Sequence, residues 1–151
     1  MVEIILLIIF YILGTILFLV SLKKAPRKDW LLIYFITAYF AVFLGNLLVD
    51  YHLLKYPVTI FKHLKGSVLF EFLLFPVICV YYYQTTYHSH ISGVILQAVV
   101  YSGGLTLVEF FLEKYTNLIK YLQWEWYFTW ISVFIFMIVV RSIMGLLNNK
   151  T

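Results

Sequence analysis

Apolar residues along the chain gather in five long runs that short polar stretches separate. The runs cover about residues 2–20, 30–54, 68–83, 91–108 and 124–140. A helix needs about 20 predominantly apolar residues to cross the ~30 Å hydrocarbon core of a bilayer, and the runs approach or exceed that length. The pattern therefore predicts one all-α domain, an integral membrane helical bundle with about five transmembrane helices.

Pro76 lies near the middle of the third run. A proline inside a helix removes one backbone hydrogen bond and kinks the helix. Membrane helices tolerate such a proline where a neighbouring group satisfies the freed carbonyl. We therefore expect a kink in the third helix and a polar partner for one of its carbonyls.

Two stretches between the runs have an amphipathic pattern, which predicts short segments at the membrane interface. Over residues 109–123 the polar positions recur at steps of four and three, with no Gly or Pro to interrupt them, and apolar positions follow the same steps on the other side. This predicts a surface helix that joins the fourth span to the fifth. Residues 57–65 show a shorter pattern of the same kind after Pro57.

Small residues recur every fourth position in two of the runs. Small side chains let helix backbones approach closely inside a bilayer, so both series predict helix-packing faces. The two series are Thr37, Ala41 and Gly45 in the second run, and Ala98, Ser102 and Thr106 in the fourth.

Composition supports the membrane interpretation, because 64% of the 151 residues are hydrophobic and 12% are charged. A globule of this size has too little interior to bury that much apolar surface. Tryptophan prefers the boundary between hydrocarbon and water, so tryptophans near the ends of the runs predict interface anchors. They are Trp30, Trp124, Trp126 and Trp130.

The net charge of +4 comes from short stretches that flank the apolar runs. Basic residues favour the cytoplasmic side, so the cluster within residues 23–28 predicts an outside N-terminus and a cytoplasmic C-terminus. We expect membrane lipids as partners, together with a second copy of the chain or another membrane protein, and no nucleic acid. Cys79 is the only cysteine, which excludes an internal disulfide, and we expect no cofactor and no metal.

Acidic residues provide the main candidate chemistry. With five spans, Asp50, Glu71 and Glu109 lie near the ends of spans on one side of the membrane, and Asn46 lies one turn before Asp50. An ionised carboxylate below the headgroups costs on the order of 2.5–3.5 kcal/mol, so such groups tend to be paired or functional. One interpretation is pairing with nearby lysines; the other is a cation or proton site built from these four residues, since hard cations take carboxylate and amide oxygens.

The chain contains no Gly-rich phosphate loop, no nucleophile elbow and no HExxH motif. No catalytic residue can therefore be assigned, and an enzyme is the less favoured class. We expect a non-enzymatic membrane component that contacts partner proteins or lipids. The alternative is a small cation or proton carrier, or a subunit of one, that uses its buried acids.

The second half of the chain carries a resemblance. Residues 66–140, with the run at 101–106, Glu109, the EKYTNLIKY segment and Trp-Glu-Trp-Tyr at 124–127, resemble an uncharacterised family of small multi-span membrane proteins from endospore-forming Gram-positive bacteria. The resemblance implies a bacterial cytoplasmic-membrane location and a helical bundle. It brings no activity, substrate or catalytic residue.

Overall fold

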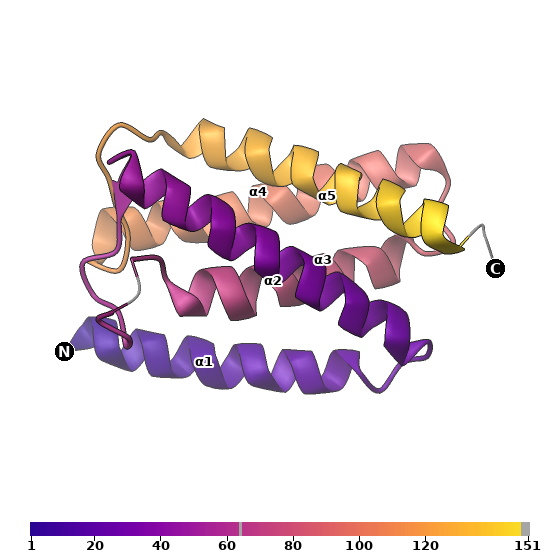
Figure 1. The fold of residues 1–151 in the computed structure, drawn as a ribbon, viewed down its shortest axis with the longest axis horizontal. Helices are drawn as coiled ribbons and strands as arrows, with labels where there is room; N and C mark the ends of the chain where they lie inside the picture. Colours follow the sequence, from indigo (N-terminus) through magenta and orange to yellow (C-terminus); the bar gives the residue numbers. More distant parts are fainter. Residues whose placement is uncertain (64, 149–151) are drawn as a thin grey trace.

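Helices make up nearly all the regular structure in residues 1–63 and 65–148, which the computed structural model describes. Five α-helices form an elongated bundle (Figure 1). They are α1 (Val2–Ser21), α2 (Arg27–Asp50), α3 (Phe75–Thr86), α4 (Ile91–Tyr115) and α5 (Trp126–Asn148). A π-helix, η1 (Leu69–Leu74), leads directly into α3. The all-α prediction is confirmed.

Four helices in the described part of the chain, α1, α2, α4 and α5, are long and apolar enough to cross a membrane. The third predicted run corresponds to η1 and α3, which together form one continuous helical segment. The N-terminus and the C-terminus lie at opposite ends of the bundle (Figure 1). Large apolar side chains cover much of the outer surface, and α1 exposes them along its whole length.

Several helices end at other positions than the apolar runs indicate. The second run extends to about residue 54, but α2 ends at Asp50; α4 continues to Tyr115 and α5 to Asn148, beyond residues 108 and 140. Hydropathy falls where charged residues begin. Backbone hydrogen bonding continues there, because Glu, Lys and Arg are good helix formers.

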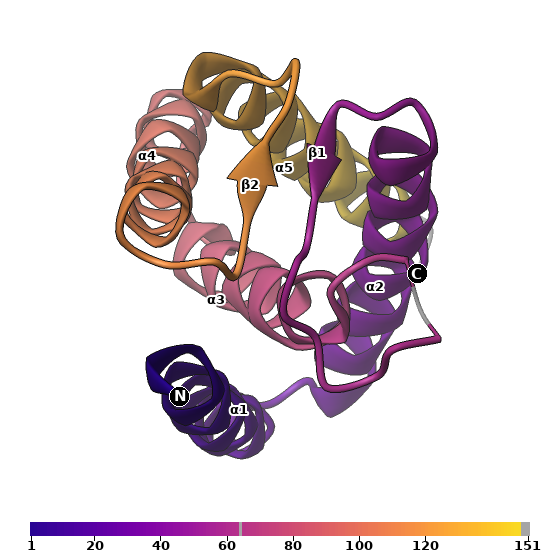
Figure 2. The same cartoon turned by 90° about the vertical axis from the view of Figure 1, so that its left-hand side faces the viewer.

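The predicted surface helix over residues 109–123 is wrong beyond Tyr115, because the chain becomes extended at Thr116. Lys120–Tyr121 forms strand β2, which pairs antiparallel with β1 (Leu54–Lys55). The two strands cross one end of the bundle, which we call the ribbon end (Figure 2).

Two sets of hydrogen bonds explain why the helix stops. The Thr116 hydroxyl donates to the Leu112 carbonyl at 2.5 Å and accepts the Leu118 amide hydrogen at 3.2 Å, which gives the backbone a local alternative to the helix. The carbonyl of Leu53 then accepts three consecutive amide hydrogens, those of residues 122, 123 and 124, at 2.9–3.1 Å. The amphipathic period carries no sign of this distant partner.

The predicted interfacial segment at residues 57–65 contains no helix among its described residues. Its described residues form turns and bends, and Leu64 lies outside the described residues. A segment this short gains too few backbone hydrogen bonds to offset the cost of helix nucleation.

The helix containing Pro76 has the predicted polar partner. Pro76 cannot donate to the carbonyl of Phe72, and the Tyr34 hydroxyl of α2 donates to that carbonyl instead, at 2.7 Å. The π-helical turns of η1 lie immediately before the proline. The neighbouring helix thus compensates for the hydrogen bond that the proline removes.

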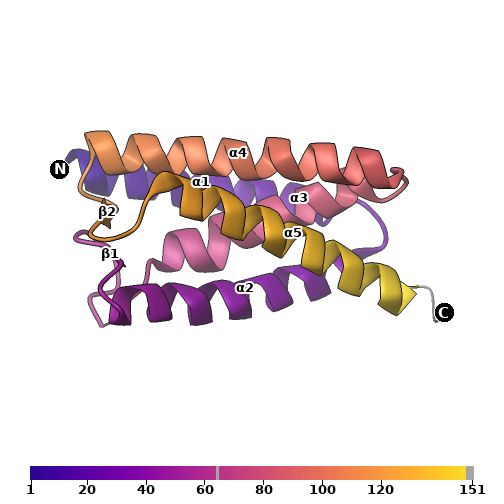
Figure 3. The same ribbon diagram turned by 90° about the horizontal axis from the view of Figure 1, so that it is seen from above.

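Both series of small residues are buried, as close helix packing requires. Figure 3 shows α5 crossing between α4 and α2. In contrast, α1 packs mainly on η1 and α3 and stays at the edge of the bundle. The small residues therefore serve contacts within the chain.

The four tryptophans have different environments. Trp126 and Trp130 are exposed, as interface anchors should be, and Trp124 is half-buried at the ribbon end. Trp30 is only 3% exposed, contrary to the expectation for an anchor. Its ring contacts Tyr83 and Tyr87 edge to face, and its N–H donates to the carbonyl of Lys24 at 2.9 Å. Trp30 is therefore a core residue at the opposite end of the bundle.

Candidate functional site

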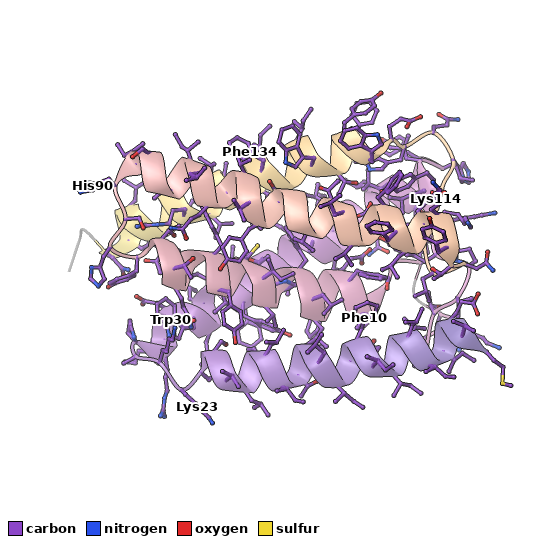
Figure 4. The ribbon with its side chains drawn as sticks, turned by 180° about the vertical axis from the view of Figure 1, so that it is seen from behind. Phe10, Lys23, Trp30, His90, Lys114 and Phe134 are labelled. Carbon is purple, nitrogen blue, oxygen red and sulfur yellow. The ribbon has the colours of Figure 1, made fainter. Side chains whose placement is uncertain are left out.

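A cavity of about 350 Å³ lies between the helices. All five α-helices, η1, and the segments around β1 and β2 contribute residues to its wall, which is mostly Leu, Phe, Val and Ile. Phe10 of α1 is one of these apolar residues and is labelled in Figure 4. The polar side chains of the wall within the described residues are Tyr56, Glu71, Glu109, Trp124, Thr129 and Ser132. The cavity thus combines an apolar interior with two carboxyl groups.

Glu71 is buried, with 7% of its surface exposed. The amide N–H of Ser67 donates to Glu71 Oε1 at 3.3 Å, and the Tyr56 hydroxyl interacts with the same carboxyl group. Gly45 of α2 and Gly66 lie against the carboxyl oxygens, where a Cβ atom on either glycine would overlap them. Glu71 belongs to η1, and π-helical turns occur frequently at functional sites. The two glycines therefore make the space that this carboxyl group occupies.

Glu109 of α4 is held from two other elements. The Tyr121 hydroxyl of β2 donates to Glu109 Oε1 at 2.7 Å, and the Thr129 hydroxyl of α5 donates to the same oxygen at 2.8 Å. The indole N–H of Trp124 donates in turn to the Thr129 hydroxyl at 2.8 Å. Among the described residues, no side chain or amide donates to Glu109 Oε2. One oxygen of Glu109 is thus fixed and the other is available.

Two tyrosines outside the helices stay protonated beside these acids. Burial, followed by the charges of Glu71 and Glu109, raises the pKa of Tyr56 well above its ordinary value. Burial is also the largest cause that raises the pKa of Tyr121, and the charge of Glu109 is the next largest. Each hydroxyl therefore keeps the proton that it presents to a carboxyl group.

Three lysines at the ribbon end contact groups other than Glu71 and Glu109. Lys65 pairs with Asp50 at 2.7 Å, and both side chains are well exposed. Lys120 donates to the backbone carbonyl of Glu113 at 2.8 Å, and Lys114, labelled in Figure 4, lies over the rings of Phe110 and Tyr115. In residues 1–63 and 65–148, no Lys, Arg or His lies within 4.0 Å of the carboxyl oxygens of Glu71 or Glu109.

The structure therefore divides the four residues of the candidate cation or proton site. Glu71 and Glu109 line one cavity. Asp50 is exposed in its pair with Lys65, and Asn46 is half-buried on α2 and does not line the cavity. Within the described part of the chain, no three His, Cys, Asp or Glu side chains are placed to hold a metal ion.

Sequence reasoning missed Tyr56, Tyr121, Thr129 and Gly66 as parts of this site. Tyr121 was assigned to a helix that does not form. Tyr56 and Gly66 belong to the connection between α2 and η1, whose path no periodicity describes. The sequence around Thr129, on the first turn of α5, gave little indication of a site residue, since a threonine in an apolar run is often a packing residue.

The arrangement can bind a molecule that is largely apolar and carries a polar group at one end. The resemblance to membrane proteins of endospore-forming bacteria stays a prediction. Searches against protein families, curated proteins and solved structures find no match for this chain.

Proposed function

We propose that this chain is a non-enzymatic, multi-pass membrane protein that takes one amphiphilic molecule from the bilayer into the cavity between its helices. Of the expected partners, the proposal favours lipids and lipid-like molecules over a protein. The observation that carries it is the cavity itself, which has apolar walls and two carboxyl groups.

The size of the cavity supports a small-molecule ligand. An apolar protein cavity of about 150 Å³ binds benzene, and ligand pockets begin near 300 Å³. At about 350 Å³, this cavity has room for a molecule of roughly twice the size of benzene. That is too small for a whole phospholipid and suits a short single chain.

The position of the cavity supports entry from the bilayer. The cavity is partly open, and three of its wall residues, Leu13, Leu44 and Val108, are also 43–46% exposed on α1, α2 and α4. They belong to the apolar outer surface that would face lipid. An apolar ligand could therefore pass from the membrane into the cavity without crossing water.

The membrane setting in this proposal is the bacterial cytoplasmic membrane, crossed five times, with the N-terminus and the ribbon end outside and the C-terminus inside. Four apolar helices, the η1 and α3 segment, and termini at opposite ends of the bundle support it. The basic cluster at residues 23–28 lies at the end opposite the ribbon, where Figure 4 labels Lys23, and supports a cytoplasmic position for that end.

Quenching of Trp124 tests the proposal, because this residue lines the cavity. A variant with Trp126→Phe and Trp130→Phe keeps two tryptophans, Trp124 in the cavity wall and Trp30 in the core at the other end. In lipid nanodiscs, bromodecanol should quench the Trp124 fraction of the fluorescence saturably. Adding Trp124→Phe leaves Trp30 as a reference that the probe should not quench.

A cavity-filling variant supplies the control for site. Gly104 lines the cavity, and a Cβ atom added there would meet no atom within 4 Å, so the bulk of Gly104→Leu has room at the cavity wall and should abolish the saturable quenching. Gly145→Leu adds the same bulk on α5, outside the cavity wall, and should leave it intact. Non-saturable quenching that is equal in both variants would show that the bromine acts from the bilayer alone and would overturn the proposal.

A small cation or proton carrier is the second candidate, and one observation favours it: two carboxyl groups line the cavity with no basic partner among the described residues. Ion or proton flux into proteoliposomes, compared between the unmodified chain and Glu109→Gln, tests this candidate. Flux equal to that of protein-free vesicles would contradict it.

A further inference from the structure

The hydrogen-bond donors in the cavity wall already donate to groups of the chain itself. Trp124 donates to Thr129, Thr129 donates to Glu109, and the Ser132 hydroxyl donates to the backbone carbonyl of Thr129 at 3.0 Å. The Tyr56 hydroxyl interacts with Glu71. A ligand group that only accepts hydrogen bonds would therefore find no free donor among the described residues of the wall.

The acceptors, in contrast, are not used up. Both hydrogen bonds to Glu109 go to Oε1, and the Ser67 amide donates to Oε1 of Glu71. Glu109 Oε2 thus receives no hydrogen bond from the described residues. The Glu71 carboxyl group accepts from the Ser67 amide, interacts with the Tyr56 hydroxyl and lies against Gly45 and Gly66, so its contribution to the cavity is mainly its charge. The described residues of the wall include no Lys, Arg or His, so their formal charge is negative wherever these acids are ionised.

These two observations define the chemistry of the ligand's polar group. We propose that the cavity selects an amphiphile whose head is a protonated amine, held by Glu71 and Glu109 while its apolar chain fills the rest of the cavity. An ammonium group supplies three donors and a positive charge, and it accepts nothing. The inference rests on the proposed function, because it specifies the ligand of the same cavity.

Other heads fit the wall less well. A carboxylate or phosphate head would meet two acids and no free donor, which is unfavourable at low dielectric. A hydroxyl head could donate one hydrogen bond and would carry no charge. A bare divalent cation requires six or more oxygen ligands, and two carboxyl groups in an apolar wall supply too few.

Three probes that share one chain and differ only in the head test the inference. Bromodecylamine, bromodecanol and bromodecanoate are titrated into nanodiscs of neutral lipid that contain the variant with Trp30 and Trp124, and binding is followed by quenching. Protein-free nanodiscs give the partition of each probe into lipid, so affinities refer to equal concentrations in the bilayer.

The amine should bind roughly ten- to hundredfold more tightly than the alcohol, which is the effect of hydrogen bonds to a charged group, and decanoate should bind most weakly. Glu109→Gln and Glu71→Gln should each remove most of the preference for the amine over the alcohol, measured as the ratio of the two affinities in the same variant. Glu113→Gln is the matched control, because Glu113 is on the same helix, does not line the cavity, and changes the overall charge equally.

The outcomes separate the two proposals. If amine and alcohol bind equally, and Gly104→Leu abolishes both signals, the cavity binds amphiphiles and the amine inference is overturned. If no probe gives saturable quenching, the proposed function fails together with the inference. The comparison of heads uses the chain with both acids intact, so it stands even if an acid variant does not fold.

Discussion

Two glycine-to-alanine substitutions on cavity-lining helices should change stability in opposite directions. Gly45 and Gly104 both lie in long helices and both line the cavity. Alanine is a better helix former than glycine by about 1 kcal/mol in either position. The space around each added Cβ atom decides the sign.

At Gly104 the added Cβ meets no atom within 4 Å, so Gly104→Ala should stabilise the protein by about 1 kcal/mol. At Gly45 the Cβ overlaps the Glu71 carboxyl group, which must move away from the Ser67 amide that donates to it. Leaving a buried donor unpaired costs about 1–3 kcal/mol, and overpacking costs about 1–3 kcal/mol more. Set against the gain in helix propensity, Gly45→Ala should destabilise by about 1–5 kcal/mol.

Cys79 provides the assay, because it is the only cysteine of the chain and is 1% exposed. A fluorogenic maleimide should react with it only on unfolding, so thermal melts in detergent give the direction of each change. In a Glu71→Ala background the carboxyl group is absent, and Gly45→Ala should no longer destabilise. A melting temperature for Gly45→Ala at or above that of the unmodified chain would refute the assignment of this glycine to the Glu71 carboxyl group.

Four further predictions concern individual side chains and the topology of the chain. Tyr34→Phe should cost about 1–3 kcal/mol, because it leaves the Phe72 carbonyl without its donor, whereas Tyr39→Phe at an exposed position should change the melting temperature little. Asp50→Asn should cost about 1 kcal/mol or less, since its pair with Lys65 is exposed, and a large loss in the same melts would speak for a buried role. The pKa values of Tyr56 and Tyr121 are raised by folding, so their contribution to stability is constant below the ordinary tyrosine pKa of 10 and is lost as the pH rises toward the folded pKa values. The melting temperature of Tyr121→Phe should therefore fall less steeply with pH above 10 than that of the unmodified chain. Equal slopes would contradict this. Cysteines introduced in a Cys79→Ser background at the N-terminus and at Lys120 should be labelled from one side of the membrane and one at His88 from the other; labelling of the first two from opposite sides would exclude five passes.

The five apolar runs predicted the helices because each run is long and apolar enough to favour a helix without help from distant parts of the chain. The ends of the helices depend on backbone hydrogen bonding, which continues through charged residues such as Glu109 and Lys114. The ribbon depends on a partner that lies far away in the chain: Tyr121 forms a strand because Leu54 is beside it, and no local period contains that information.

The sequence predicted only part of the candidate site. Counting spans places Glu71 and Glu109 on one side of the membrane, and the structure brings both to one cavity. Counting spans places Asp50 on that side too, but its side chain is exposed and pairs with Lys65. The count gives the height of a residue along the bundle and does not say which side of its helix the residue is on. Gly45 was predicted as a helix contact, and its small size also accommodates the carboxyl group of Glu71 on the neighbouring η1.

Photo-crosslinking locates the ligand within the chain and so tests the central claim most directly. A decylamine that carries a diazirine on its chain is irradiated with the protein in nanodiscs, and the modified residues are mapped by mass spectrometry. Our account predicts modification of cavity residues such as Leu105 and Phe136, and its loss in Gly104→Leu. Modification confined to outward-facing residues such as Ile5 and Ile9 of α1, unchanged in Gly104→Leu, would contradict a binding cavity.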